Sequence, residues 1–396
     1  MQNSADPLAW ILAPYCAEEF TRVHWEKQPL FVPRSNRGYY EGMITLAQFD
    51  DLLSTTPDIG HRLRVVHEGK EVSFSPPSQI ASAPYLEQIF AQYRKGATIS
   101  VTHLHDRWPP LTQLCERLTD TFSAECQVNA YLTPRWSQGL SRHYDTHDVF
   151  VLQVEGTKRW NLGGFGTPLP LRDTRGDPQS LAAMELRDEI ELTPGDMLYI
   201  PRGIVHEAIS TESASFHLTI GVKSLTYADL LSAEFDALFE RDSQFRAALP
   251  IGFDRDSDAN LAANAQLSYL LTQISELVSS EQSIDNARNL LTLGRRPSLN
   301  RHILDLEAVD ALDEHTEVRR RPTLRWQIEQ VDLDTMHLTY HGKVVSLPAS
   351  SREALAFMAT GQKFTAIAMQ TRLDMPSRLL ILKKLLSEGF LTLATS

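Results

Sequence analysis

The chain has 396 residues, 42% of them hydrophobic, and a formal net charge of -12. This length predicts more than one domain with a large core. The acidic balance argues against broad binding to nucleic acid or anionic membranes and is compatible with a basic protein or peptide partner. The three cysteines, Cys16, Cys115 and Cys126, form no CxxC pair. This usage is typical of a reducing compartment and disfavours a disulfide framework or a thiolate zinc site. The first residues do not resemble a signal peptide, and no apolar run reaches the roughly 20 residues that span a bilayer, so we expect a cytoplasmic protein.

The N-terminal part mixes a few helices with many short strands. Residues 8–20 and 45–53 have helical patterns, and Pro14 is expected to kink or end the first helix. Strand patterns run mainly from residue 98 to residue 222, interrupted by loop-like insertions at 163–168 and 172–179.

Two polar pairs lie on alternating segments within these predicted strands. Asn129 and Tyr131 share one face of the first segment, and His217 and Thr219 share one face of a later segment. Each pair could line a cavity. A pair of polar core residues with satisfied hydrogen bonds is the alternative.

The most informative feature is His143-Tyr144-Asp145, followed downstream by His206. If the first segment is a strand, His143 and Asp145 point to the same side. Residues 195–200 read as a turn leading into an apolar strand, and residues 201–203 as a tight turn before His206. Two imidazoles and one carboxylate occupy one face of an octahedral metal, an arrangement that suits non-haem Fe(II) with a cosubstrate and O₂. Unrelated histidines and a solvated Asp are the alternative, which the turn–strand–His element disfavours.

Lys158 opens the strand that follows the apolar strand 148–154 and a Gly turn. Neighbouring strands of a barrel lie within about 5 Å of each other, so Lys158 is expected to face the same cavity as His143. Its ammonium would there pair with the distal carboxylate of a 2-oxo acid that chelates the metal. A solvated surface Lys is the alternative.

Residues 226–312 change to helical patterns. Ser257 and Asp258 are expected to cap a helix with an apolar stripe, which consists of Leu267, Leu270, Leu271, Ile274, Leu277 and Val278. The stripe predicts either packing within a helical subdomain or a dimer interface.

The last part follows a linker at 319–322. It is expected to contain three strands and three helices, which are predicted at 324–328, 336–340, 343–347, 351–358, 364–373 and 377–386. This pattern resembles a winged helix, which often binds DNA through one helix. The last helix offers only Arg378, Lys383 and Lys384, so a structural or protein-contact module is favoured over DNA binding.

These motifs together resemble a known family over essentially the whole chain. The segment from Asn129 to Trp160, with its HYD and KRW motifs, is similar to the JmjC-domain ribosomal oxygenases, and so is the opening motif at 24–30. These cupin-like proteins are Fe(II)- and 2-oxoglutarate-dependent protein hydroxylases. The resemblance implies an α+β fold: a double-stranded β-helix (JmjC/cupin) barrel at 1–225, a helical dimerisation segment at 226–315 and a C-terminal winged-helix domain at 316–396.

The resemblance also implies roles for particular residues. The metal ligands would be His143, Asp145 and His206, and Lys158 would anchor 2-oxoglutarate. The other cofactor- or substrate-binding positions would be Asn129, Tyr131, His217, Thr219, Gly221 and Asp148. Lys158 inclines the chain towards the histidyl-hydroxylase-like branch, although Gly221 stands where that branch has a substrate-facing Ser.

The expected reaction is hydroxylation of a side chain in a basic ribosomal-protein segment, with O₂ as the second cosubstrate. Histidine is favoured and arginine comes next, because Gly221 is expected to leave extra room. Asp148 and Glu207 are expected to lie on the groove rim and to steer the basic segment. The same chemistry on a peptide natural product or on methyl-lysine, and a non-enzymatic cupin-like metal-binding module, are the alternatives. A homodimer is expected, and neither nucleic acid nor a membrane is expected as a partner.

Overall fold

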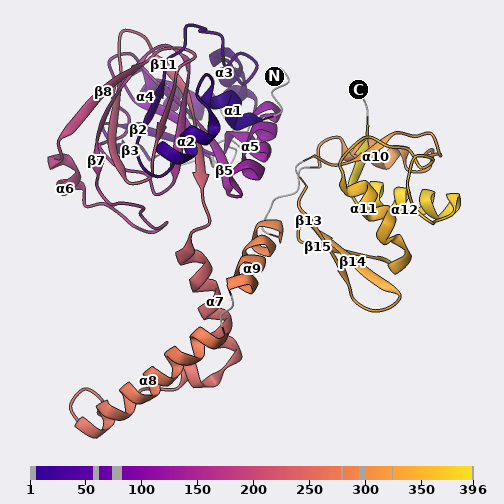
Figure 1. The fold of residues 1–396 in the computed structure, drawn as a ribbon. Helices are drawn as coiled ribbons and strands as arrows, with labels where there is room; N and C mark the ends of the chain where they lie inside the picture. Colours follow the sequence, from indigo (N-terminus) through magenta and orange to yellow (C-terminus); the bar gives the residue numbers. More distant parts are fainter. Residues whose placement is uncertain are drawn as a thin grey trace. The chain divides into compact units, whose positions relative to one another are not determined.

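The structure, a computed structural model, describes residues 6–56, 62–73, 83–277, 280–293, 299–322 and 324–394. It divides the chain into two compact units, Met1–Ser224 and Leu225–Ser396 (Figure 1). The expected subdivision of the second unit near residue 315 remains a prediction, and Val278 of the expected stripe lies outside the described residues.

The first unit contains short helices around a large set of strands. Its described helices are α1 (Pro7–Leu12), α2 (Ala17–Val23), α3 (Leu46–Thr55), α4 (Ala83–Arg94), α5 (Pro109–Phe122) and α6 (Pro178–Ala183). Its described strands are β1 (Leu30–Val32), β2 (Leu63–His67), β3 (Lys70–Glu71), β4 (Thr98–Val101), β5 (Glu125–Thr133), β6 (Asp148–Glu155), β7 (Lys158–Phe165), β8 (Leu186–Leu192), β9 (Met197–Ile200), β10 (Ile204–Ser210) and β11 (Ser215–Lys223).

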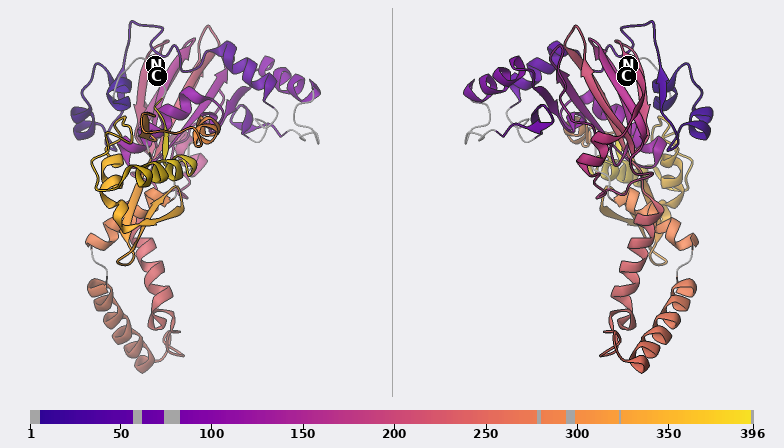
Figure 2. Two further views of the ribbon diagram at one scale, coloured as in Figure 1. Left: turned by 90° about the vertical axis from the view of Figure 1, so that its right-hand side faces the viewer. Right: turned by 90° about the vertical axis from the view of Figure 1, so that its left-hand side faces the viewer.

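These strands form two antiparallel sheets. The larger has the order β1-β9-β6-β11-β5-β4-β2-β3 and the smaller the order β10-β7-β8. Figure 2 shows the strands standing side by side with helices flanking them. The mixture of helix with two antiparallel sheets agrees with the expected barrel.

Strand alternation separates a packed face of the large sheet from a polar one. In β5, Val128 and Ala130 are completely buried in the main hydrophobic core, while Asn129 and Tyr131 point to the opposite face. On the packed side, Phe20 of α2 meets Tyr199 of β9 with ring centroids 4.8 Å apart. Burying one such large side chain contributes about 1.5–3 kcal/mol, so this face fixes the sheet whose other face carries the pocket.

Local expectations for the first unit are confirmed in part. The helical pattern at 8–20 is split at Pro14 into α1 and α2, as proline rules require. The expected loop at 163–168 is wrong in its first half, because residues 163–165 continue β7 and pair with β8 and β10. His143–Asp145 is not part of a regular strand; His143 makes a single bridge to His206.

The second unit begins with helices and continues into a small mixed α/β part. Its described helices are α7 (Tyr227–Arg241), α8 (Ser257–Leu277), α9 (Ser280–Leu293), α10 (His302–Ala308), α11 (Arg352–Ala359) and α12 (Met375–Ser387). Its described strands are β12 (Val318–Arg320), β13 (Trp326–Gln330), β14 (Thr335–Tyr340), β15 (Lys343–Pro348) and β16 (Leu391–Leu393). The expected cap of α8 is shifted by one residue, because Asp256 accepts the backbone N–H groups of Asp258 and Ala259 at 3.0 and 2.9 Å.

The C-terminal part has a three-stranded sheet, β13-β14-β15, and a two-stranded sheet, β12-β16. The helix predicted at 364–373 is wrong: these residues form turns, with one bridge between Phe364 and Val318. The Arg378 guanidinium fills the turns by donating to the carbonyls of Leu373, Ala366 and Thr371 at 2.9, 3.2 and 3.0 Å. Among the described residues, no helix is long and apolar enough to cross a membrane.

Candidate metal centre

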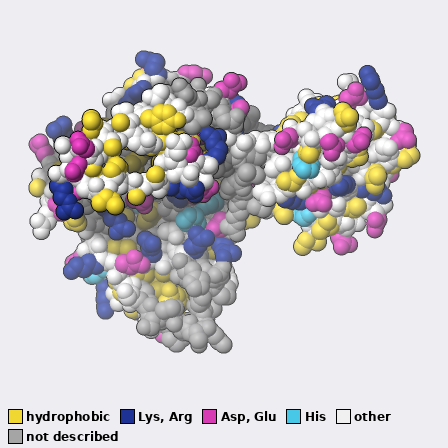
Figure 3. All heavy atoms as spheres, turned by 90° about the horizontal axis from the view of Figure 1, so that it is seen from below, with side chains coloured by type: hydrophobic (Ala, Val, Ile, Leu, Met, Phe, Trp, Pro, Cys, Tyr) yellow, Lys and Arg dark blue, Asp and Glu magenta, His cyan; other side chains and the backbone are white. Residues whose placement is uncertain are grey.

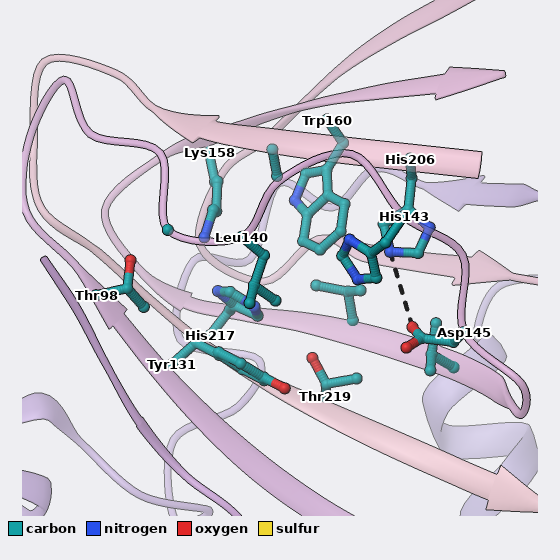
Figure 4. Close-up of a pocket in the computed structure, with 14 residues that line it drawn as sticks. Thr98, Tyr131, Leu140, His143, Asp145, Lys158, Trp160, His206, His217 and Thr219 are labelled. Carbon is teal, nitrogen blue, oxygen red and sulfur yellow. Dashed lines mark ion pairs between the residues drawn. The ribbon is translucent and has the colours of Figure 1, made fainter. Parts of the chain in front are cut away.

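Three of the predicted ligands come together in the first unit. Ligand atoms of His143, Asp145 and His206 all lie within 4.8 Å of one another (Figure 4). The backbone N–H of His143 donates to the His206 carbonyl at 3.1 Å, and the reverse bond measures 2.8 Å. The N–H of Gly203 also donates to the Asp145 carbonyl at 2.9 Å. Backbone hydrogen bonds therefore join the segment of the first two ligands to the turn and strand of the third.

In both histidines a neighbouring backbone carbonyl determines which ring nitrogen carries the proton. Nδ1 of His143 lies 2.7 Å from the Ser141 carbonyl, and Nδ1 of His206 lies 3.0 Å from the Ile204 carbonyl. A carbonyl only accepts, so each Nδ1 carries the proton and each Nε2 keeps its lone pair. Nε2 of His206 lies 3.7 Å from a carboxylate oxygen of Asp145. This donor set fits a divalent transition metal bound on one side.

The protonation states of His206 and Asp145 suit a metal. Burial, assisted by the neighbouring His143, lowers the pKa of His206 to about 4. Burial alone would raise the pKa of Asp145, but the nearby His147, His143 and His206 outweigh it and lower that pKa. At neutral pH His206 is therefore neutral and Asp145 ionised, which are the forms that coordinate.

A pocket opens beside the three ligands. It encloses about 590 Å³ of space, counted out to its open mouth. Both sheets and the loop before His143 contribute its walls, which are formed by Thr98, Tyr131, Gly139, Leu140, His143, Asp145, Val149, Val151, Lys158, Trp160, His206, Ala208, His217 and Thr219.

Lys158 lies in this pocket and is 5% exposed, so the solvated-surface alternative is wrong. Its Nζ donates to Thr133 Oγ1 at 3.0 Å, and that hydroxyl lies 3.0 Å from Thr98 Oγ1. Burial lowers the pKa of Lys158 to about 7. No acidic group of the described residues forms an ion pair with it. A buried ammonium that faces a cavity without a counterion favours an anionic ligand.

The predicted cosubstrate and substrate residues divide into two sets. Tyr131, His217 and Thr219 line the pocket, and the Tyr131 and His217 rings stack with centroids 5.0 Å apart. Burial raises the pKa of Tyr131 to about 12, so its hydroxyl keeps its proton. Asn129 does not line the pocket; its Oδ1 accepts the His103 N–H at 3.0 Å.

Three expectations about the substrate side are corrected. Gly221 leaves no extra room, because an added Cβ would come within 2.6 Å of the His147 ring. Asp148 cannot steer a substrate from the rim: it is completely buried and accepts the Tyr199 hydroxyl at 2.6 Å. Glu207 is engaged by Arg142, with Nε 3.1 Å from its carboxylate, which leaves less free charge for steering.

Sequence reasoning missed Trp160 and the threonines next to Lys158. The Trp160 ring lies 5.9 Å from the His206 ring and 5.6 Å from the His217 ring, and it forms part of the pocket wall. Side chains alternate between the two faces of a strand, so Trp160, two residues after Lys158, could have been predicted on the same face of the strand as Lys158. Thr98 and Thr133 gave no comparable signal, because their relation to Lys158 depends on pairing between strands far apart in sequence.

Comparisons with known proteins agree with this fold. Residues 103–230 match the JmjC domain. The chain is 31% identical over 313 residues to the bifunctional lysine-specific demethylase and histidyl-hydroxylase NO66 of Drosophila persimilis, a match that covers 72% of this chain and 43% of that protein. It is 32% identical over 266 residues to ribosomal oxygenase 1 of Gallus gallus, covering 63% and 43%. The chain thus spans less than half the length of these curated relatives.

A solved structure is similar over nearly the whole chain. The ribosomal oxygenase YcfD of Escherichia coli, determined with cobalt and 2-oxoglutarate, superposes with a TM-score of 0.56 at 19% identity and covers 96% of this chain and 99% of that one. The matched domain and the site define a JmjC-domain protein with a cupin-like barrel. Within that class, the chain belongs to the family whose members are named ribosomal oxygenases, as its sequence motifs predicted.

Proposed function

We propose that this chain is an Fe(II)- and 2-oxoglutarate-dependent oxygenase that hydroxylates a side chain of a ribosomal protein. One observation carries the proposal: a His–Asp–His triad opens into a pocket that also contains a buried lysine with no acidic partner among the described residues. The names of the relatives support an oxygenase that acts on ribosomal proteins. The overall reaction would consume 2-oxoglutarate and O₂ and would yield succinate, CO₂ and a hydroxylated side chain.

The residues of the pocket have distinct tasks in this proposal. Bound Fe(II) would supply the oxidising chemistry with O₂. His143, Asp145 and His206 would hold the metal from one side and leave the pocket side open. Lys158 would bind the distal carboxylate of 2-oxoglutarate through a charge-assisted hydrogen bond.

The aromatic wall would exclude water and orient the substrate. Trp160 and His217 line the pocket together with Lys158, whose Nζ lies 5.9 Å from the Trp160 ring centroid, and Tyr131 presents a protonated hydroxyl that can donate to a substrate group. The charge of -12 suits a basic segment, whereas Asp148 and Glu207 no longer support steering.

We propose a histidyl side chain as the preferred target, with arginine second. Lys158 and the histidyl-hydroxylase name of the relatives support histidine. The same name includes lysine-specific demethylase, so removal of a methyl group from lysine is the second candidate function. Gly221 does not enter this choice, because the His147 ring occupies the adjacent space.

The test is to measure the products that the purified protein forms. The purified protein, with Fe(II), 2-oxoglutarate and ribosomal proteins, should form succinate, and intact masses should rise by one oxygen atom. Loss of a methyl group instead would favour demethylation. Bound metal with neither product would leave a non-enzymatic cupin-like module.

We also propose that the chain is a cytoplasmic homodimer that uses its helical segment. Figure 3 shows hydrophobic side chains gathered among polar ones on the face that it views. Leu267 and Leu271 of the predicted apolar stripe on α8 are 54% and 57% exposed. A dimer would bury such a stripe. Light scattering of Leu267→Glu beside the unmodified chain would test it, with a monomeric mass expected for the variant only.

For the C-terminal part we propose a winged-helix-like module for protein contacts. Its sheet β13-β14-β15 and helices α11 and α12 support this. Nucleic-acid binding is disfavoured, because Lys383 and Lys384 donate to the carbonyls of Asp310 and Ser346, and Arg378 fills the preceding turns. A filter-binding assay with duplex DNA should show no retention at physiological salt.

A further inference from the structure

A largely buried polar network joins segments that precede and follow the metal ligands in sequence, but it does not line their pocket. Arg202 Nη2 donates to Glu26 Oε1 at 2.6 Å, the Glu26 backbone N–H donates to the Tyr199 hydroxyl at 2.9 Å, and this hydroxyl donates to Asp148 Oδ1 at 2.6 Å. None of the four residues is among those that form the pocket wall.

The network connects the two segments that carry the metal ligands. Asp148 begins β6 three residues after Asp145, and Arg202 lies in the turn between β9 and β10, four residues before His206. Tyr199 belongs to β9 and pairs with Phe150 of β6. The network therefore connects the start of β6, which follows Asp145, to the turn that precedes β10 and His206.

The N-terminal segment supplies the parts that complete this network. The Trp25 ring stacks on the Tyr199 ring with centroids 5.9 Å apart and an interplanar angle of 21°. At the other end of β9, the Arg34 backbone N–H donates to Asp196 Oδ1 at 2.6 Å and its Nη1 donates to the Gly195 carbonyl at 2.9 Å. Residues 25–34 thus hold both ends of the strand that leads to His206.

Burial makes these contacts consequential. Asp148 and Tyr199 are completely buried and Arg202 is 9% exposed, whereas the Glu26 side chain is 29% exposed. Removing Glu26 would leave the buried Arg202 guanidinium without its carboxylate partner, so the turn would shift to find water or a new partner. Burial raises the pKa of Asp148 to about 6, and the Tyr199 hydroxyl opposes that rise by stabilising the carboxylate.

We propose that Glu26 and Tyr199 are positioning residues for the metal triad. They hold the 201–203 turn and the start of β6 in register, so that His206 lies opposite His143 and Asp145 before any metal binds. This inference rests on the metal-binding part of the proposed function and deepens it. It assigns to the N-terminal segment a role in shaping a metal site that it does not touch.

The first test is Co(II) titration of the purified full-length chain without 2-oxoglutarate, followed by visible absorption. Groups that orient metal ligands typically change metal affinity about 10–100-fold, and the indirect contact here leads us to expect about tenfold weaker binding for Tyr199→Phe and Glu26→Gln. Tyr39→Phe removes another partly buried hydroxyl, which donates to the Trp10 carbonyl at 2.6 Å, and should bind Co(II) normally. Glu19→Gln is the exposed control for the charge change.

The second test needs no metal. Hydrogen exchange of the Gly203 and His206 amides, which donate to Asp145 and His143, should accelerate in both variants and not in the two controls. In Glu26→Gln combined with Arg202→Gln, Co(II) affinity should fall no further than in the worse single variant, because the two residues form one pair.

The outcomes separate this inference from the proposed function. Folded variants with unchanged Co(II) affinity and unchanged exchange would overturn the positioning role, even if the unmodified chain turned over 2-oxoglutarate. An unmodified chain that bound Co(II) but formed no succinate would overturn the proposed reaction and leave the positioning role intact.

Discussion

Buried Lys158 in the first unit and Arg378 in the second illustrate two uses of a basic side chain. Arg378 donates to three carbonyls of its own neighbourhood. Lys158 donates to one threonine hydroxyl, has no acidic partner among the described residues, and faces a pocket that contains a metal-ligand triad. The difference lies in unused hydrogen-bonding capacity, because charge that the fold already satisfies stabilises structure and charge that it leaves unsatisfied can bind a ligand.

Among the substitutions that test this contrast, loss of a metal ligand should have the largest effect on activity. His206→Ala removes a ligand and should reduce succinate formation to background, since two protein ligands do not hold the metal. Succinate can be measured by mass spectrometry. His315→Ala changes an exposed histidine of the second unit and should keep full activity. Full turnover by His206→Ala would exclude the proposed metal site.

Lys158→Ala should have the next largest effect. Loss of a charge-assisted bond in a buried site costs about 1.5–3 kcal/mol, so the half-saturating 2-oxoglutarate concentration should rise roughly tenfold to over a hundredfold. Co(II) affinity without cosubstrate should not change. Lys158→Arg should also be impaired, because its planar fork is longer. Lys384→Ala removes an exposed lysine that donates to a carbonyl and should change neither value.

The low pKa of Lys158 predicts a pH effect. Burial lowers this pKa to about 7, so the ammonium fraction of the free enzyme falls as pH rises through 7. The half-saturating 2-oxoglutarate concentration should therefore increase above about pH 7 and be flat below about pH 6. Lys158→Arg should lose this dependence, because Arg stays charged. A wild-type value that does not change from pH 6 to 8.5 would contradict the assignment.

Arg378→Ala should give the smallest effect on activity and a measurable effect on stability. Hydrogen bonds from a charged group contribute about 1.5–3 kcal/mol, so loss of this side chain should lower the free energy of unfolding of the C-terminal part by about that amount. Chemical denaturation would report it, and 2-oxoglutarate turnover should not change. Lys383→Ala, which loses one exposed contact, should remain near the wild-type stability.

The site was predictable where sequence spacing encodes it. The turn–strand–His element before His206 and the Gly turn before Lys158 indicated the ligand and the inward cation, and the structure brings both to one pocket. The strand expected at His143–Asp145 did not form; His143 makes an isolated bridge to His206, and the Asp145 carbonyl accepts the Gly203 N–H. Backbone bonds from a turn about 60 residues away have the role that a strand was expected to have.

The errors arose where a distant partner determines the conformation or exposure of a residue. The sequence classed Asp148 as a rim carboxylate, but Tyr199 provides the hydroxyl that permits its burial. Residues 364–373 had a helical pattern, but the Arg378 guanidinium stabilises turns by donating to three of their carbonyls. Local periodicity contains no information on such partners, which is also why Thr98 and Thr133 were missed.

Thr98 and Thr133, the threonine pair beside Lys158, have a consequence for how the pocket would bind a carboxylate. An ammonium is only a donor, so Thr133 Oγ1 accepts from Lys158, and its own hydrogen is polarised towards Thr98 Oγ1. Thr98, which faces the pocket, can then turn its hydrogen inward. The relay gives the pocket a directed sequence of donors that starts at the cation. An entering carboxylate would thus meet two donors, the Lys158 ammonium and the Thr98 hydroxyl, and this pair would suit one end of a diacid.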